Sequence, residues 1–169
     1  MMKHEGEKPH AVWQLPKLDK KAVFAAFKDT LEKSLGTLGR NIEETKQRAR
    51  DAPGAMQSHH DTTKKELSGL SESLENTLQE RTESLARASQ YSTLPCFSVQ
   101  PGALVSAISD NGISVYFILP GGEGTQLEVN GAEILVISPT ASLFDVMAKK
   151  IPGQSFNFCG IDYDILTIQ

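Results

Sequence analysis

The side chains best suited to chemistry lie together in one short stretch, Asp51 to Asp61, which reads DAPGAMQSHHD. The stretch combines a Pro-Gly pair with two aspartates and two adjacent histidines. Carboxylates and imidazoles bind metal ions and exchange protons near neutral pH, so this composition is found at metal and acid–base sites. The same residue types also form turns and helix caps. The segments on either side must therefore decide between the two interpretations.

Both neighbouring segments have the apolar spacing of a coiled-coil helix. Apolar residues recur at intervals of three or four from Phe24 to Ile42, and a second series runs from Leu67 to Leu85 with Arg81 at one of its positions. Such a stripe forms the seam between paired helices. If the two helices pair antiparallel, the residue numbers of facing positions add up to 108 or 109 at every step. Arg81 then faces the ring of Phe27. The sequence predicts a two-helix hairpin.

Pro53 and Gly54 lie at the centre of this pairing and predict the turn, because Pro lacks a helix donor and Gly permits positive φ. The hairpin is then a finger about 45 Å long, at 1.5 Å per residue. Ser58 and Asp61 fit a capping box, and adjacent histidines point in different directions on a helix, which disfavours a shared metal. We expect a turn with neither metal nor cofactor, whose contact residues are Asp51, Gly54, Gln57, Ser58, His59, His60 and Asp61.

Charge separates the chain into two parts. Residues 1–91 carry 15 Lys and Arg against 14 Asp and Glu, a net of +1, whereas residues 92–169 carry 2 against 7, a net of −5. The overall charge of −4 disfavours a general nucleic-acid binder, which would present a basic face. The apolar runs VYFIL and ILVI are far shorter than the roughly 20 residues of a membrane span. With no signal-like segment, a cytoplasmic protein without a membrane partner is expected.

Residues after 91 alternate short β-type runs with turn signals. ALVSAISD and ISVYFILP flank Asn111-Gly112, which predicts a hairpin with a type I′ turn. QLEV and EILVIS flank Asn130-Gly131, a helix is expected at SLFDVMAKK, and GQSFNF and YDILTIQ complete the strands. Gly121 to Gly124 lacks the helix and Lys of a phosphate-binding loop and predicts a wide turn. Cys96 and Cys159 lack metal or disulfide spacing, and both are expected to be buried.

The fold class predicted is α+β: an N-terminal antiparallel two-helix coiled-coil finger and a C-terminal, largely antiparallel β domain with one helix. The boundaries expected are a flexible tail at 1–17, the coiled-coil hairpin at 18–91 with its tip near 52–58, a linker at 92–101 and the β domain at 102–169. The order of these parts along the chain resembles that in the bacterial Gre transcript-cleavage factor family.

The most specific matching segment is ISPTASLFDVMAKKIPGQSFNFCGIDYDILTI, which is similar to the family's strand, helix, Lys-x-x-Gly turn and two terminal strands. Lys150 and Gly153 fall on that turn. GISVYFILPGGEGTQLEVNGAEILVIS resembles the preceding strands of the GreA/GreB-like branch. The Ser-Pro-Leu-Gly motif that commonly opens the family's helix falls here on Ala141 to Phe144, and only its leucine, Leu143, is retained. The resemblance implies an FKBP-like C-terminal domain that docks at the rim of the RNA polymerase secondary channel while the coiled coil enters it.

The tip departs from the family pattern. Members that stimulate transcript cleavage carry two acidic residues there to hold a catalytic Mg²⁺, and Gly54 and Gln57 fall on those positions. Neither supplies an anionic oxygen for Mg²⁺. The resemblance therefore implies a transcription regulator that binds RNA polymerase, is not itself an enzyme, makes no direct sequence-specific nucleic-acid contact and does not stimulate cleavage.

Two alternatives stay open. One is a cleavage factor that uses Asp51 and Asp61 at the tip. The other is an FKBP-like protein-interaction or chaperone module with an aromatic-lined pocket. Aromatic residues in short strands usually pack in the core, so we expect core positions for most of the candidates. Those candidates are Tyr116, Phe117, Phe144, Phe156, Phe158 and Tyr163.

Overall fold

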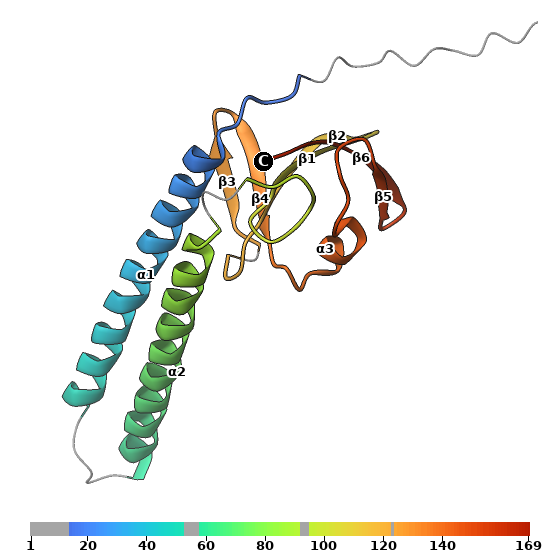
Figure 1. Ribbon diagram of the computed structural model, residues 1–169. Coiled ribbons are helices and arrows are strands. Elements are labelled where there is room, and N and C mark those ends of the chain that lie inside the picture. The colour runs from blue at the N-terminus through green and yellow to red at the C-terminus, as the bar shows by residue number, and fades with distance from the viewer. Residues whose placement is uncertain (1–13, 53–57, 92–94, 123) are drawn as a thin grey trace, which may run out of the picture.

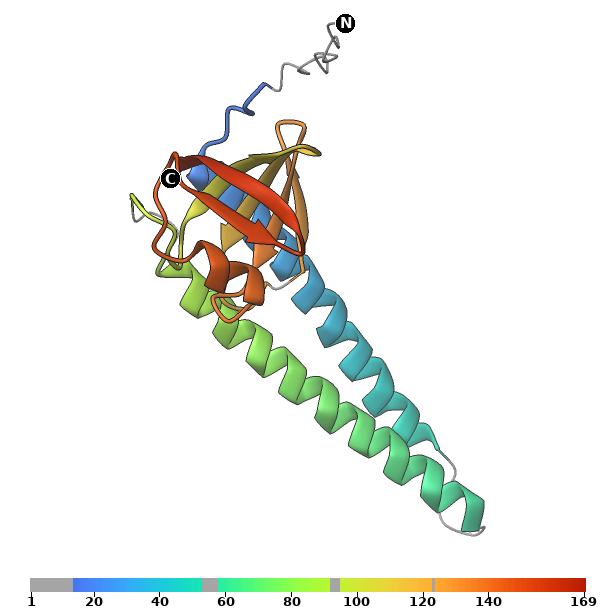
Figure 2. The ribbon, with the colours of Figure 1, turned by 90° about the vertical axis from the view of Figure 1, so that its right-hand side faces the viewer.

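Two long helices form a finger, and a six-stranded sheet with one short helix forms a domain at its base (Figure 1). The computed structural model describes residues 14–52, 58–91, 95–122 and 124–169, with the backbone alone for residues 58–61. Figure 2 shows both helices leaving the domain on the same side and ending far from it. The α+β fold class predicted from the sequence is confirmed.

The finger consists of α1 (Lys20–Asp51) and α2 (Ser58–Ser89), each of 32 residues. A helix of that length rises about 48 Å at 1.5 Å per residue. Asp19 caps the start of α1, where its Oδ2 accepts a hydrogen bond from the Ala22 backbone N–H at 3.3 Å. The helix closes with the Ala52 N–H, which donates to the Arg48 carbonyl at 3.0 Å. Both helices lie where the apolar spacing predicts them.

The domain is built on one sheet, with strands in the order β3-β4-β2-β1-β6-β5. The strands pair antiparallel except for β2 and β4, which are parallel. The elements are β1 (Leu104–Ser109), β2 (Gly112–Ile118), β3 (Gln126–Val129), β4 (Ala132–Ile137), α3 (Ser142–Met147), β5 (Ser155–Phe158) and β6 (Ile161–Ile168).

The two Asn-Gly turns differ in geometry. Asn130 and Gly131 both have positive φ, at 53° and 76°, as a type I′ turn between β3 and β4 requires. The type I′ prediction for Asn111-Gly112 is wrong. Ser109 pairs with Gly112, so Asp110 and Asn111 are the central residues of that turn, and positive φ occurs only afterwards, at Gly112.

The sheet has two buried faces, because alternate residues of each strand point to opposite sides. One face, which includes Phe117 and Val136, packs against Val23, Phe27 and Leu31 of α1. The finger is therefore joined to the domain through a common apolar core, in which one fully buried Phe contributes about 1.5–3 kcal/mol.

The opposite face is covered by α3 and by the segment before β1. Leu143 and Met147 of α3 lie in this second core with Cys96 and Val99. The latter half of the expected linker at 92–101 is therefore packed onto the domain. Cys96 is buried as predicted, but Cys159 is exposed, because it occupies the β5–β6 turn with a φ of 52°.

The predicted alignment of the two helices is wrong. In that alignment Lys46 faces residues 62–63, yet its ammonium pairs with the Glu75 carboxylate, about 18 Å further along at 1.5 Å per residue. Arg81 Nη1 donates to Ser34 Oγ at 2.8 Å instead of lying on Phe27. The cause is the sheet, which takes Phe27 and its apolar neighbours on α1 out of the seam.

The aromatic residues occupy the core positions expected of them. Tyr116, Phe117 and Phe156 are buried, and the remaining three pack against the buried cluster. Phe156 and Tyr163 stack with ring centroids 5.0 Å apart. Core packing, the role favoured by the sequence, therefore accounts for them.

Candidate functional site

Asp51 is the tip residue that the structure describes in full. It ends α1 with an exposed side chain, and both carboxylate oxygens accept hydrogen bonds from Gln47 Nε2, at 2.9 and 3.0 Å. Among the side chains that the structure describes, no three His, Cys, Asp or Glu residues come together as a metal site. Asp51 is thus positioned by an amide rather than by a second acid.

The other tip candidates lie partly or wholly outside the described residues. Gly54 and Gln57 fall within 53–57, which the structure does not describe. α2 begins at Ser58, where the capping pattern locates its start. The side chains of Ser58, His59, His60 and Asp61 are outside the described set, so their capping and contact roles stay predictions.

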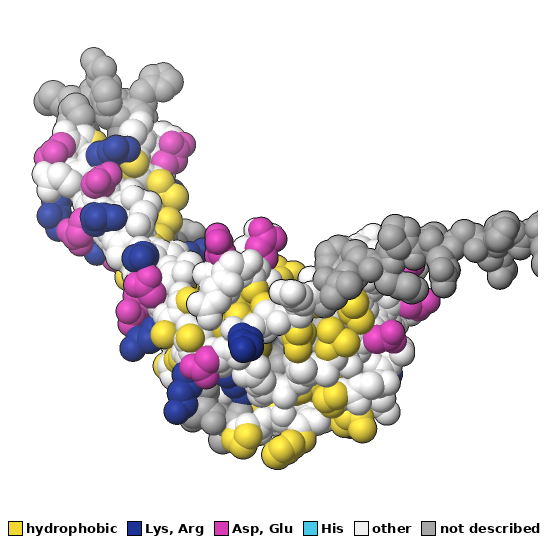
Figure 3. Space-filling view, turned by 90° about the horizontal axis from the view of Figure 1, so that it is seen from above, with side chains coloured by type: hydrophobic (Ala, Val, Ile, Leu, Met, Phe, Trp, Pro, Cys, Tyr) yellow, Lys and Arg dark blue, Asp and Glu magenta, His cyan; other side chains and the backbone are white. Residues whose placement is uncertain are grey.

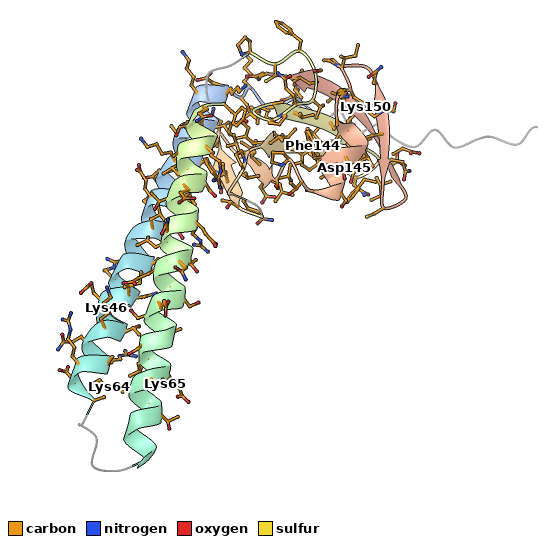
Figure 4. All side chains as sticks on the ribbon, turned by 60° about the horizontal axis from the view of Figure 1, so that its bottom comes forward. Lys46, Lys64, Lys65, Phe144, Asp145 and Lys150 are labelled. Atoms are coloured by element: carbon orange, nitrogen blue, oxygen red, sulfur yellow. The ribbon has the colours of Figure 1, made fainter. Side chains whose placement is uncertain are left out.

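Basic side chains gather at the far end of the finger. The ranges 46–51 and 61–66 contain five Lys and Arg residues against Asp51, Asp61 and Glu66. Figure 4 shows Lys46, Lys64 and Lys65 in the half of the finger remote from the domain. The near-neutral total of residues 1–91 conceals this cluster, which the spacing of Lys and Arg around the predicted turn would have revealed. A cluster of this sign attracts anionic partners.

Lys46 is the basic residue of this group with a defined carboxylate partner. The hydrogen bond that Lys46 donates to Glu75, and then the negative charge of Glu75, raise the pKa of Lys46 above its ordinary value of 10.5. The pair joins α1 to α2 and leaves Lys46 charged throughout the physiological pH range.

The family-motif residues in the domain shape its backbone. Leu143 is buried in the core beneath the sheet. The Lys150 carbonyl accepts from the Val99 N–H at 2.8 Å, and Gly153, with a φ of 87°, donates its N–H to the Ile165 carbonyl at 2.8 Å. Lys150 and Gly153 therefore shape the segment between α3 and β5, whereas Leu143 holds α3 in the core.

Exposed apolar residues form a second surface beside that turn. Phe97 is 83% exposed and Ile151 is 48% exposed. Val99 bonds to both Lys149 and Lys150 through its backbone, so the segment carrying Phe97 lies alongside the segment carrying Ile151. In Figure 3, hydrophobic side chains gather on the domain while charged side chains line the finger. Exposed apolar clusters mark protein interaction sites.

Comparison with known proteins gives structural similarity alone. No protein-family model matches the sequence, and no relative is found among curated proteins. The solved structures similar to the chain include the GreA factor homolog 1 (Gfh1) protein of Thermus thermophilus, with a TM-score of 0.36 and 10% identity over 85% of this chain and 95% of that one.

Two further structures give the same result. One is described as the transcription factor Gfh1, with a TM-score of 0.35 and 12% identity over 85% of this chain and 94% of that chain. The other is Thermus aquaticus Gfh1, with a TM-score of 0.35 and 14% identity over 90% of this chain and 96% of that chain. Similarity at this level says nothing of what the present chain binds.

The remaining surface features limit the alternatives. No helix in the described part of the chain is long and apolar enough to cross a membrane. Two cavities lie along the finger, one at its base and one in its far half, and none of the six aromatic candidates lines either of them. The finger end and the apolar surface of the domain are the candidate contact sites for a protein partner.

Proposed function

We propose that this chain is a transcription regulator that binds RNA polymerase, with its finger in the secondary channel and its domain docked at the rim of that channel. The observation that carries the proposal is the joint between the two parts. Val23, Phe27 and Leu31 belong to the core of the sheet, so the finger is a rigid extension of the domain. RNA polymerase is proposed as the partner because the segment from Ile137 to Ile168 resembles the Gre family.

The charge of the finger end fits this placement. A narrow channel that leads to a polymerase active site ends at the phosphates of nucleic acid and nucleotides. Lys64, Lys65 and Arg50 present positive charge at the far end of the finger, where phosphates would be met. Contacts to phosphates carry no sequence information, which agrees with a regulator that reads no sequence.

The chemistry of the tip supports regulation by position rather than by catalysis. Gly54 and Gln57 stand where cleavage-stimulating members of the Gre family hold acids, and the Asp51 carboxylate is engaged by Gln47. The finger then acts by occupying the channel or by altering the geometry of the active site, and any cleavage remains a reaction of the polymerase.

The apolar surface supplies the docking contact. Phe97 and Ile151 are exposed beside the turn after α3, and burial of two such side chains in an interface removes apolar area from water. The acidic character of residues 92–169 would add complementarity to a basic rim.

The test is binding to the cognate polymerase together with transcription and cleavage assays on backtracked complexes. Phe97→Ser should weaken binding, whereas Leu70→Ser, which alters an exposed leucine on the shaft, should not. Replacing Lys64 and Lys65 by Glu should abolish the effect on transcription while the domain still binds. A pull-down with this chain that recovers no polymerase at low salt would overturn the proposal.

The cleavage assay also decides the alternative mechanism. If the wild-type chain stimulates cleavage, the proposal of a regulator that does not stimulate cleavage would be wrong. Replacing Asp51 and Asp61 by Asn should then abolish the stimulation. Binding without stimulated cleavage is the result expected.

A further inference from the structure

A cavity of about 360 Å³, lined by both polar and apolar surface, lies at the junction of the finger and the domain. Its walls come from the base of α1, from the last turns of α2 and from the turn after β2. A volume of this order is typical of small-molecule sites, which begin near 300 Å³. Neither the sequence motifs nor the proposed docking surfaces account for it.

The turn after β2 forms a close-fitting wall. A Cβ placed at Gly121 would overlap with the side chain of Ser84, and one at Gly122 would overlap with the ring of Phe27. The glycines therefore allow the backbone of the turn to lie directly against both helices. On this side the cavity is bounded by the tightly packed turn, and on the side of α2 it is bounded by the exposed side chains of Glu80 and Arg81.

Two arginine–serine pairs direct hydroxyl donors in this region. Arg81 Nη1 donates to Ser34 Oγ at 2.8 Å, and Arg87 Nη2 donates to Ser84 Oγ at 3.0 Å. A hydroxyl that accepts from an arginine keeps its own proton to donate. Ser34 and Ser84 both line the cavity, and Ser84 is only 9% exposed. Each serine can thus donate to an acceptor in the cavity.

Arg81 adds positive charge to the same wall. It interrupts the leucine series of α2, and among the described residues it forms no ion pair. Its remaining N–H groups can serve an oxyanion in the cavity, because guanidinium has five donors. Among the described residues Glu80 is the carboxylate in the lining, and its exposed oxygens can accept hydrogen bonds from hydroxyl groups of a ligand.

We propose that this cavity binds a small phosphate ester. The phosphate lies against Arg81, Ser34 and Ser84, where charged and hydroxyl donors converge on its oxygens. The organic part of the ligand presents hydroxyl groups to the Glu80 carboxylate, as a ribose does. The ligand contacts both the finger and the domain, so its binding stabilises the arrangement of the two parts.

The experiment is isothermal titration calorimetry of the full chain with three probes: inorganic phosphate, ribose 5-phosphate and AMP. The sugar phosphates should bind more tightly than inorganic phosphate. Arg81→Gln should weaken all three by roughly tenfold to a hundredfold, the range for one charged hydrogen bond. Arg40→Gln is the matched control, because Arg40 is an exposed arginine on the shaft that bonds to Thr37 Oγ1 at 3.3 Å.

Glu80→Gln separates the two halves of the site. It should weaken ribose 5-phosphate and AMP but leave inorganic phosphate unchanged or tighter. Unfolding temperatures of every variant establish that the fold is intact. No saturable heat with any probe, or equal losses for Arg81→Gln and Arg40→Gln, would overturn the proposal. Equal affinity for inorganic phosphate and the esters would overturn the role of Glu80. The proposal stands or falls independently of polymerase binding.

Discussion

Phe27 of α1 lies so close to Gly122 that a Cβ at the glycine would overlap with the phenyl ring. The contact joins the finger to the turn after β2, and Val136 of β4 closes the same site from the sheet. A residue that the spacing places in the helix seam is therefore part of the core of the domain. The stability of the sheet and the direction of the finger depend on the same side chain.

Gly122→Ala should destabilise the protein by about 1–3 kcal/mol, because an added methyl overpacks a close contact. Gly36→Ala is the control, since a Cβ at Gly36 meets nothing within 4 Å. It should raise stability by up to about 1 kcal/mol, the difference in helix propensity. Urea unfolding followed by circular dichroism measures both. An unchanged midpoint for Gly122→Ala would contradict the packing described here.

Lys20 joins the base of the finger to the end of the chain. Its buried ammonium donates to the Gln169 carbonyl at 3.2 Å and lies 3.5 Å from Cys96 Sγ. Lys20→Met should cost about 1–3 kcal/mol, because the substitution removes a charged donor from the Gln169 carbonyl and from the buried Cys96 Sγ. Lys21→Met, which alters the exposed neighbour, should cost little.

Alkylation of Cys96 reports the same contact. Opening of the region by Lys20→Met should speed the reaction of Cys96 with iodoacetamide, followed by mass spectrometry of peptides. Exposed Cys159 is an internal standard whose rate should not change. Equal protection of Cys96 in both variants would show that the lysine does not hold this region closed.

The raised pKa of Tyr116 predicts that the protein loses stability at alkaline pH. Burial in the core raises the pKa of its hydroxyl above the ordinary value of 10.0, although a hydrogen bond from Ser114 acts in the opposite direction. The folded state therefore holds this proton more tightly than the unfolded state. The resulting stabilisation is complete below pH 10.0 and is lost as the pH rises through the pKa of the folded state.

Absorbance at the tyrosinate band measures this titration. Tyr116 should ionise above pH 10.0, and Tyr116→Phe should remove that late component. The variant should also lose less stability than the wild type when the pH is raised beyond 10.0. A late component that persists in Tyr116→Phe would assign it to another tyrosine.

Ser71 carries a buried hydroxyl that has no hydrogen-bond partner among the described residues. Ser71→Ala should leave stability unchanged or raise it by about 1 kcal/mol, since it removes an unsatisfied polar group. Ser68→Ala serves as control, because the exposed Ser68 hydroxyl donates to the Lys64 carbonyl at 2.9 Å. A clear loss of stability for Ser71→Ala would show that the hydroxyl bonds to water in the cavity beside it.

The sequence predicted those features that neighbouring residues decide. The strands follow local alternation and Gly-containing turns, so β1 to β6 and α3 lie at the predicted runs. The end of α1 at Asp51 and the start of α2 at Ser58 also agree with local signals, whereas the predicted turn at Pro53-Gly54 lies outside the described residues. The type I′ geometry at Asn111-Gly112 failed because the strand pairing places the turn one residue earlier.

Features that depend on contacts distant in sequence were missed. The helix alignment failed because Phe27 is taken into the sheet, so that Leu70 is 50% exposed while Ser71 is buried. The apolar surface at Phe97 and Ile151 arises when two segments about 50 residues apart meet. No pattern of spacing within either segment contains that information.

The ion pair of Lys46 with Glu75 provides a direct test of the helix alignment in solution. The pKa of Lys46 is raised first by the hydrogen bond to Glu75 and then by its charge. Glu75→Gln should therefore return that pKa toward 10.5, measured by NMR titration of the lysine side chain. Glu72→Gln, one turn away in α2 and lining the same cavity, should leave the pKa of Lys46 raised.

The pH dependence of stability has a definite sign in this case. Because the folded state raises the lysine pKa, the stabilisation from the pair is complete below pH 10.5 and is lost as the pH rises through the folded pKa. Glu75→Gln should remove that alkaline loss. If Lys46 faced residues 62–63, as the apolar spacing alone predicts, neither Glu75→Gln nor Glu72→Gln would move its pKa. A Lys46 pKa that does not respond to Glu75→Gln would restore the alignment predicted from the sequence.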